Sequence, residues 1–307
     1  MSFDSLIEKI KQMNNPTVAG LDPNLSYIPS YIKHNYFNNV KTNDDLFTAA
    51  ANSILEFNKG LIDELYDIVP AVKPQCAYYE MYGWQGVKAL KETISYAKSK
   101  GMYVIVDGKR NDIGTTMEAY SKAFIGKTIF ENTEVPAFDG DALTVNGYLG
   151  TDGIKPLIDI CKDDEKGIFV LCKTSNKSSG ELQDQKIGIK TVYETMGEMC
   201  EGWGSGTIGK FGYSAVGAVV GATYPEQLKE LREKMPHTFF LVPGYGAQGG
   251  GALGIKFAFD NNKIGAIINS SRAIMCAYQK ANGDEKDFAK YAREEAIRMR
   301  DDIASAL

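Results

Sequence analysis

The chain has 307 residues, is 44% hydrophobic and 24% charged, and carries a formal net charge of −5. This composition is typical of a globular protein. The acidic balance argues against nucleic acid as the main partner, and no apolar run approaches the roughly 18 residues of a membrane helix. The five cysteines are scattered, without the spacing of a zinc site or a small disulfide framework. With an N-terminus unlike a signal peptide, they predict a cytoplasmic protein with reduced thiols.

Eight short β-branched or apolar runs are separated mostly by helix-length segments, and they cover residues 17–22, 71–75, 103–109, 142–146, 168–174, 215–221, 239–244 and 266–271. Helical periodicity or composition predicts helices at residues 46–65, 84–100, 190–202, 225–234 and 284–304. This alternation predicts parallel βαβ units, and eight of them predict one (β/α)8 TIM barrel of the α/β class. We expect a single domain over residues 1–307, with an extra helical segment at 24–67 between the first two strands.

An open doubly wound sheet is the alternative fold, because it also alternates strands and helices. Such a sheet usually has a glycine-rich dinucleotide turn after its first strand, and none follows residues 17–22. This absence and, more strongly, the count of eight strands favour the barrel over the open sheet.

The third strand ends in charged residues. Period-two alternation places Ile105, Asp107 and Lys109 on one face, so a carboxylate and an ammonium follow an apolar interior position. An unpaired buried charge costs roughly several kcal/mol, so these groups must be paired or used. An ordinary ion pair at a strand-to-helix junction, with Asp112 near the helix N-terminus, is the structural alternative.

Polar residues also follow most of the other predicted strands. In a (β/α)8 barrel the active site lies at the C-terminal ends of the strands, so these residues converge on one rim. Each has a simpler explanation, because Asp22 could start a turn, Lys73 or Lys173 could extend into solvent, and Thr174 or Ser175 could cap a helix. Their joint occurrence favours a site formed by Asp22, Lys73, Gln75, Asp107, Lys109, Thr144, Asn146, Lys173, Thr174 and Ser175.

The last two strand ends predict a phosphate site. Glycines at positions 244, 246, 249, 250 and 251 allow backbone N–H groups to approach an anion, and Arg272 follows the next strand with a planar donor fork. The chain has only two histidines, His34 and His237, and neither forms a convincing base or metal triad. We therefore expect chemistry by lysine and carboxylate, without a metal.

The segment Asp107-Gly-Lys109-Arg-Asn-Asp112 resembles the Asp-x-Lys-x-x-Asp signature of orotidine 5'-phosphate decarboxylases. Lys73 resembles the first lysine of that family's Lys-Asp-Lys-Asp tetrad. The runs Leu-Cys-Lys-Thr-Ser-Asn at 171–176 and Val-Pro-Gly-Tyr-Gly-Ala-Gln-Gly-Gly at 242–250 resemble the longer bacterial and protozoal branch, and the match extends from Asp22 to Arg272. Lys177 stands where that branch is expected to have proline.

The resemblance implies the last step of pyrimidine nucleotide synthesis, in which orotidine 5'-phosphate loses carbon dioxide and gives UMP without metal or organic cofactor. It implies that Asp107 faces the substrate carboxylate, that Lys109 protonates the C6 carbanion, and that Lys73 fixes Asp107 and the ribose hydroxyls. The remaining implied contacts are Asp22 and Gln75 at the ribose, Thr174 and Ser175 at the pyrimidine, and Gln248, Gly250 and Arg272 at the phosphate.

In that family, residues that match Asp112 and Thr116 reach the active site of the partner subunit. The resemblance therefore implies an obligate homodimer, with no nucleic acid or membrane as partner. Three alternatives stay open: a Mg²⁺-dependent sugar-phosphate lyase of the same suprafamily, which shares the short signature; a Schiff-base aldolase using Lys73 or Lys173; and a catalytically silent sensor of a phosphorylated ligand on a barrel.

Overall fold

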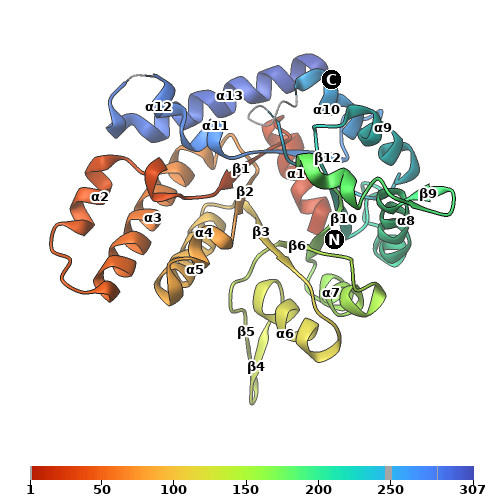
Figure 1. Ribbon diagram of the computed structural model, residues 1–307, viewed down its shortest axis with the longest axis horizontal. Coiled ribbons are helices and arrows are strands. Elements are labelled where there is room, and N and C mark those ends of the chain that lie inside the picture. The colour runs from red at the N-terminus through yellow and green to blue at the C-terminus, as the bar shows by residue number, and fades with distance from the viewer. Residues whose placement is uncertain (1, 246–250, 282) are drawn as a thin grey trace.

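The computed structural model describes residues 2–245, 251–281 and 283–307. Eight parallel strands close into a barrel in the order β1-β12-β11-β10-β7-β6-β3-β2, with helices around it (Figure 1). Each strand overlaps one of the predicted runs: β1 Thr17–Leu21, β2 Ala71–Pro74, β3 Tyr103–Arg110, β6 Ala142–Val145, β7 Gly167–Lys173, β10 Val216–Val220, β11 Phe240–Val242 and β12 Ala266–Ser270. The predicted (β/α)8 barrel is confirmed, and the open-sheet alternative is wrong.

The longer helices are α1 Ser2–Met13, α2 Ser30–Phe37, α3 Asn43–Leu65, α5 Gly83–Ser99, α6 Gly114–Phe124, α7 Thr151–Asp163, α8 Val192–Gly204, α9 Pro225–Lys234 and α13 Phe288–Ala306. Short helices are α4 Ala77–Glu80, α10 Ala252–Ile255, α11 Arg272–Met275 and α12 Ala277–Ala281. Single 3-10 turns cover η1 Leu25–Tyr27, η2 Lys177–Glu181, η3 Ser205–Thr207, η4 Lys256–Ala258 and η5 Glu285–Asp287.

Two predicted helices begin later than expected. The segment expected at 190–202 becomes helical only at Val192, because Lys190–Thr191 forms strand β9, which pairs with β8 Lys186–Ile187. Thr191 then caps α8, since its side chain accepts a hydrogen bond from the N–H of Glu194. The last predicted helix starts at Phe288, after the turn η5.

A second hairpin lies outside the barrel and was not predicted. Strands β4 Thr128–Phe130 and β5 Thr133–Val135 pair antiparallel between α6 and β6, and Figure 1 shows them extending away from the barrel. Phe130 at the end of β4 is 62% exposed. No helix in the part of the chain that the structure describes combines the length and apolar character needed to cross a membrane.

Helix α1 covers the end of the barrel opposite to the rim predicted for the site. Phe3 packs against Phe169 and Phe239 of the barrel, with ring centroids 4.8 and 5.4 Å apart. A Cβ at Gly167, the first residue of β7, would lie 2.9 Å from the Phe3 ring, so the helix contacts the N-terminal ends of the strands. The apolar side chains of residues 3, 6, 7 and 10, all in α1, pack with inward-facing residues of the strands in one buried cluster.

Helices α2 and α3 form an added layer between β1 and β2. Thr42 and Asp45 form a capping box at the start of α3, which satisfies N–H groups that a helix end leaves unpaired. One face of α3 is fully buried through Ile54, Phe57 and Leu61, at the spacing expected of a packed helix. Phe57 contacts Phe288 of α13 at 5.0 Å between ring centroids, so this layer packs against the C-terminal helix.

Candidate active site

Asp107 lies near the C-terminal end of β3, where the inward face of the strand changes from apolar to charged. Its carboxylate accepts four hydrogen bonds, and its side chain is only 8% exposed. Lys73 Nζ donates to Oδ2 at 2.6 Å and Gln75 Nε2 donates to the same oxygen at 2.9 Å. Lys109 Nζ donates to Oδ1 at 2.7 Å and the Thr144 hydroxyl donates to the same oxygen at 2.7 Å. Side chains from β2, β3 and β6, and from Gln75 just after β2, thus meet at one carboxylate.

The charges in this cluster hold one another ionised. Burial by itself raises the pKa of Asp107, but the positive charges of Lys73 and Lys109 outweigh it and bring that pKa well below its usual range. Burial likewise lowers the pKa of Lys73, and the negative charges of Asp107 and Asp22 overcome it, so the pKa of Lys73 is raised. Both groups are therefore charged at neutral pH, although both are buried.

Lys109 reaches Asp107 through an irregular backbone. Its φ is +45°, in the left-handed region that a residue with a side chain rarely adopts. The register between β3 and β6 shifts between Val106 and Arg110, so the alternation expected from the sequence does not continue through Lys109. The Lys109 N–H donates to the Thr144 hydroxyl at 3.0 Å, which ties this bulge to β6. Backbone strain of this kind is concentrated at functional sites.

Asp112 and Thr116 follow β3 but do not join the cluster of their own chain. The Asp112 side chain makes a local contact, since its Oδ1 accepts a hydrogen bond from the Ile113 N–H at 2.8 Å. Thr116 is exposed on the first turn of α6. The structure therefore brings together Lys73, Asp107 and Lys109 from the predicted tetrad and leaves the fourth member, the half-buried Asp112, outside the cluster.

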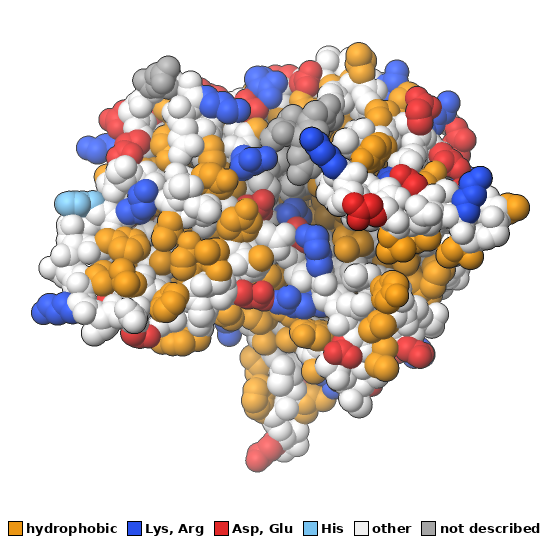
Figure 2. Space-filling model, in the orientation of Figure 1, with side chains coloured by type: hydrophobic (Ala, Val, Ile, Leu, Met, Phe, Trp, Pro, Cys, Tyr) orange, Lys and Arg blue, Asp and Glu red, His pale blue; other side chains and the backbone are white. Residues whose placement is uncertain are grey.

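Two pockets adjoin the charged cluster and share Lys73, Asp107 and Pro243. The pocket that contains Arg272, here called the arginine lobe, has a volume of about 200 Å³ and is lined further by Asp22, Gln75, Tyr78, Asn269 and Ser271. The other, here called the threonine lobe, has a volume of about 230 Å³ and is lined by Lys109, Thr144, Thr174, Ser175, Asn176 and the apolar Leu171, Val219 and Leu241. Figure 2 shows this face hollowed near its centre, with basic and acidic side chains gathered there.

The arginine lobe contains polar groups that lack a protein partner. The Oδ1 atoms of Asp22 and Asn269 are buried and have no hydrogen-bond partner within the described chain. Such groups are costly unless a ligand or water satisfies them, so they mark a binding surface. We did not predict Asn269. Period-two alternation along β12 could have identified Asn269, because it places this residue on the same strand face as the barrel-interior residue Ile267. Gln248 and Gly250, predicted for the phosphate, lie outside the described residues.

Lys173 at the end of β7 is fully buried. Its Nζ donates to Asp184 Oδ1 at 2.6 Å and to the Ser179 hydroxyl at 3.2 Å. The alternative that Lys173 extends into solvent is wrong, because it holds the loop between β7 and α8. Thr174 does not cap a helix either, since it hydrogen-bonds to Gln183 and Asn176.

No three His, Cys, Asp or Glu side chains within residues 2–245, 251–281 and 283–307 are grouped so that they could hold a metal ion. The groups that surround Asp107 are instead two ammonium groups, one amide and one hydroxyl. This arrangement can place a fixed negative charge next to a bound ligand and a proton donor beside it.

Comparisons with known proteins point to one family over nearly the whole chain. The family model described as "Orotidine 5'-phosphate decarboxylase / HUMPS family" matches residues 45–285. A protein of Caldicellulosiruptor bescii named orotidine 5'-phosphate decarboxylase is 41% identical over 305 residues, which cover 99% of this chain and 98% of the relative. A protein of Clostridium perfringens with the same name is 42% identical over 308 residues, covering 100% and 99%.

Solved structures agree with the sequence relatives. The structure of Leishmania donovani OMP decarboxylase is 31% identical, has a TM-score of 0.69, and aligns with 97% of this chain and 98% of its own. Full-length relatives at this identity share one activity, and they favour it over the lyase and sensor alternatives. This chain therefore belongs to the orotidine 5'-phosphate decarboxylase family and is a carbon–carbon lyase that removes the carboxyl group of orotidine 5'-phosphate.

Proposed function

We propose that this enzyme converts orotidine 5'-phosphate to UMP by electrostatic catalysis at Lys73, Asp107 and Lys109, with Asp112 as the fourth catalytic residue, and without metal or cofactor. The observation that carries the proposal is Asp107, a buried carboxylate kept ionised by two lysines at the junction of two pockets. A fixed negative charge in this place repels a substrate carboxylate and favours its loss.

The bond-breaking and protonation steps use Asp107 and Lys109 of this cluster. Two like charges about 4 Å apart repel by roughly 4 kcal/mol at an effective dielectric of about 20, and the repulsion ends when neutral carbon dioxide leaves. The electrons of the broken C–C bond stay on C6, and the Lys109 ammonium donates its proton there. The Lys109 side chain suits this task because it is 46% exposed at the threonine lobe, whereas Lys73 is buried and fixes Asp107.

The two lobes divide the substrate between them. In the arginine lobe, Arg272 binds the phosphate, and Asp22 and Gln75 bind the ribose. The family resemblance also assigns Gln248 and Gly250, which lie outside the described residues, to the phosphate. In the threonine lobe, Thr174 and Ser175 contact the pyrimidine, whose ring packs against the apolar wall of that lobe. Because the lobes meet at Asp107, binding at the phosphate end holds the reacting carboxylate in place.

We further propose a homodimer in which Asp112 and Thr116 complete the site of the partner subunit. One supporting observation is that these residues do not reach the cluster of their own chain. Another is that exposed apolar side chains follow the neighbouring strands β2, β3 and β6 on the same rim: Met81 at 58%, Trp84 at 67%, Ile113 at 51% and Tyr148 at 76% exposure. Apolar groups gathered in this way are typical of a surface that a second subunit covers.

The protein is also proposed to act in the cytoplasm as a single domain. All five cysteines are buried free thiols, as expected of a protein in a reducing compartment. The barrel strands extend from Thr17 to Ser270, and both terminal helices pack on the barrel or its surrounding layer.

An ultraviolet assay of orotidine 5'-phosphate, at fixed enzyme and with or without EDTA, tests the function. We expect the same turnover in both samples. Loss of activity in EDTA favours the Mg²⁺-dependent lyase, and UMP binding without any turnover favours the sensor. A covalent adduct after borohydride treatment with substrate indicates a Schiff base and excludes the proposed mechanism.

A further inference from the structure

Lys109, the proposed proton donor, has a backbone conformation that its neighbours must hold in place. Its φ is +45°, and the register between β3 and β6 shifts around it. A residue with a side chain in this region is strained, and the conformation persists only where the surroundings enforce it. One restraint comes from β6, since the Lys109 N–H donates to the Thr144 hydroxyl at 3.0 Å.

Arg110 provides a second restraint on the same backbone. Its Nη1 donates to the Gly108 carbonyl at 3.1 Å, so the side chain one residue after Lys109 binds the carbonyl one residue before it. The stem of Arg110 also packs on Gly108, because a Cβ at that glycine would lie 3.4 Å from Arg110 Cγ. These contacts close a small ring around the Lys109 backbone. Rotation of Lys109 toward an extended φ would move the Gly108 carbonyl away from the guanidinium and break this ring.

The Arg110 guanidinium is itself held by two helices. Its Nη2 pairs with the Glu80 carboxylate at the end of α4. Its central carbon lies over two rings of α6, 5.0 Å from the centroid of Phe124 and 5.8 Å from that of Tyr120. An arginine fork that is stacked on rings and paired with a carboxylate keeps one orientation. The Gly108 carbonyl therefore meets a donor whose position is fixed from outside β3.

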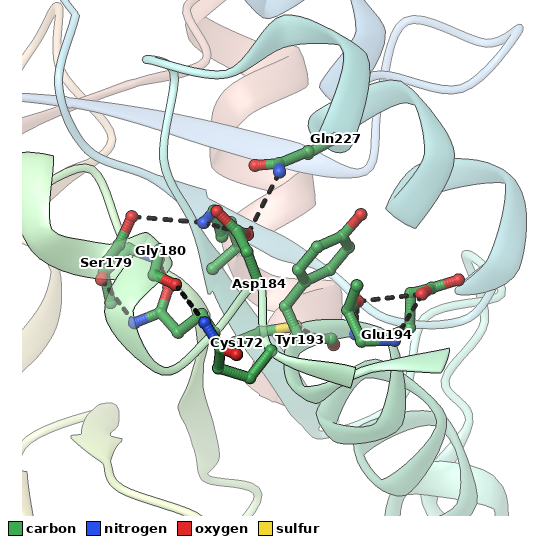
Figure 3. Close-up of polar contacts among 12 residues, drawn as sticks. Cys172, Ser179, Gly180, Asp184, Tyr193, Glu194 and Gln227 are labelled. Atoms are coloured by element: carbon green, nitrogen blue, oxygen red, sulfur yellow. Dashed lines mark hydrogen bonds and ion pairs between the residues drawn. The ribbon is translucent and has the colours of Figure 1, made fainter. Parts of the chain in front are cut away.

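Lys173, the lysine at the end of β7, is held in a different way. Its Nζ donates to Asp184 Oδ1 at 2.6 Å, and the same oxygen accepts from Gln227 Nε2 at 3.3 Å (Figure 3). Its φ lies outside the positive region. Of these two lysines, Lys109 has the strained backbone and the arginine restraint, and it lines the threonine lobe. This contrast links the restraint to the position of the Lys109 ammonium.

We infer that Arg110 is a positioning residue for the reaction, which acts through the Gly108 carbonyl to hold Lys109 where its ammonium reaches Asp107 and C6 of the substrate. The inference rests on the proposed role of Lys109 as proton donor. Arg110 touches no substrate in this account, since neither lobe, as the described residues form it, is lined by this side chain. Its loss should therefore slow the chemical step and leave nucleotide binding intact.

The test compares Arg110→Met with Arg293→Met in the full chain. Arg293 of α13 is a matched control, because it also pairs with one carboxylate, Asp67, and donates to one backbone carbonyl, that of Glu64. Methionine keeps an unbranched apolar stem and removes every donor. Single-turnover conversion of orotidine 5'-phosphate measures the chemical step, and titration calorimetry measures UMP affinity. We expect Arg110→Met to slow single turnover about tenfold to hundredfold, with UMP affinity within about twofold of wild type, and Arg293→Met to change neither.

An unchanged single-turnover rate in Arg110→Met overturns the inference, and so does an equal slowing in Arg293→Met or a loss of UMP affinity as large as the loss of rate. If Arg110→Met does not fold, Arg110→Lys decides. Lysine keeps the charge beside Glu80 but brings one nitrogen in place of the fork, so it cannot replace both contacts, and the rate must fall there too. These outcomes judge Arg110 in an active enzyme, whereas a wild-type enzyme that leaves orotidine 5'-phosphate intact refutes the proposed function on which the inference rests.

Discussion

At the scale of single residues, two opposing effects set the ionisation state of the Asp107 carboxyl group. Burial alone would neutralise this carboxyl, but Lys73 and Lys109 stand at 2.6 and 2.7 Å and reverse the outcome. Removing one partner of such a buried pair is costly, because the other charge stays behind without compensation. The two lysines differ in burial, so they are expected to respond differently to substitution.

Lys109→Ala should remove nearly all turnover while UMP binding survives, because the proton donor is lost and the pocket remains. Steady-state kinetics and UMP titration measure the two effects. Lys127→Ala is a matched control, since Lys127 is 45% exposed and also pairs with a carboxylate, Asp164, at 2.6 Å. Activity above about a tenth of wild type, a barrier change below about 1.4 kcal/mol, would contradict the role of Lys109.

Asp107→Asn should lower the free energy of unfolding by about 3 kcal/mol at pH 7, because Lys73 then lies buried without its counter-charge. The pKa of Asp107 is depressed in the folded state, so its ionic contribution is complete above the unfolded pKa of about 3.9 and is lost as pH falls toward the folded value. The difference between wild type and variant should therefore stay constant from pH 7 to about pH 4 and shrink below it. Chemical denaturation across this range measures it, and a difference that grows in acid refutes the account.

At the scale of elements, α1 is a helix that the spacing of apolar residues could have predicted and that we did not predict. Phe3, Leu6, Ile7 and Ile10 recur at the spacing of one helix face, and all four are buried against the barrel. The charged residues between them, such as Glu8, led us to treat the segment only as unlike a signal peptide. The hairpin of β4 and β5 differs, because three-residue strands leave little periodicity to detect.

Phe3→Ala should destabilise the protein by about 3–5 kcal/mol, because it empties space between Phe169 and Phe239 at the closed end of the barrel. Phe130→Ala, the same substitution at an exposed position of the hairpin, should change stability by less than about 0.5 kcal/mol. Thermal or chemical unfolding compares the two. The affinity of folded Phe3→Ala for UMP should match wild type, and equal effects of both substitutions would show that α1 does not close the barrel.

At the scale of the whole molecule, the proposed dimer divides each site between two chains. If Asp112 acts across the interface, a mixed dimer of Lys109→Ala and Asp112→Ala subunits has one site with every group intact. Either variant alone has none. Random pairing makes half the dimers mixed, so co-refolded equal amounts should regain about a quarter of wild-type activity, measured by the same ultraviolet assay.

Each variant refolded separately is the control for this experiment. If the mixture stays as inactive as its components while the two chains are shown to pair, Asp112 acts within its own chain or not at all. Activity in Asp112→Ala alone near the wild-type level would likewise remove it from the catalytic group.

The sequence by itself determined the strands, their number and their polar ends. Period-two alternation and the break from apolar to charged residues are local properties, so residues 103–109 identified both a strand and a candidate site. The same local rules placed Arg272 just after the last strand, where β12 ends at Ser270. They also gave the predicted helices to within a few residues, with α8 and α13 both beginning later than expected.

Only the tertiary structure decided which of these polar groups meet. Lys73 and Lys173 both end barrel strands, yet one pairs with Asp107 at the pockets and the other is buried against Asp184. The bulge at Lys109 and the outward position of Thr116 depend on the register of β3 with β6 and on the loop that follows. The physical reason is that register and barrel closure arise from contacts between distant segments, whereas sequence periodicity reports only on neighbours along the chain.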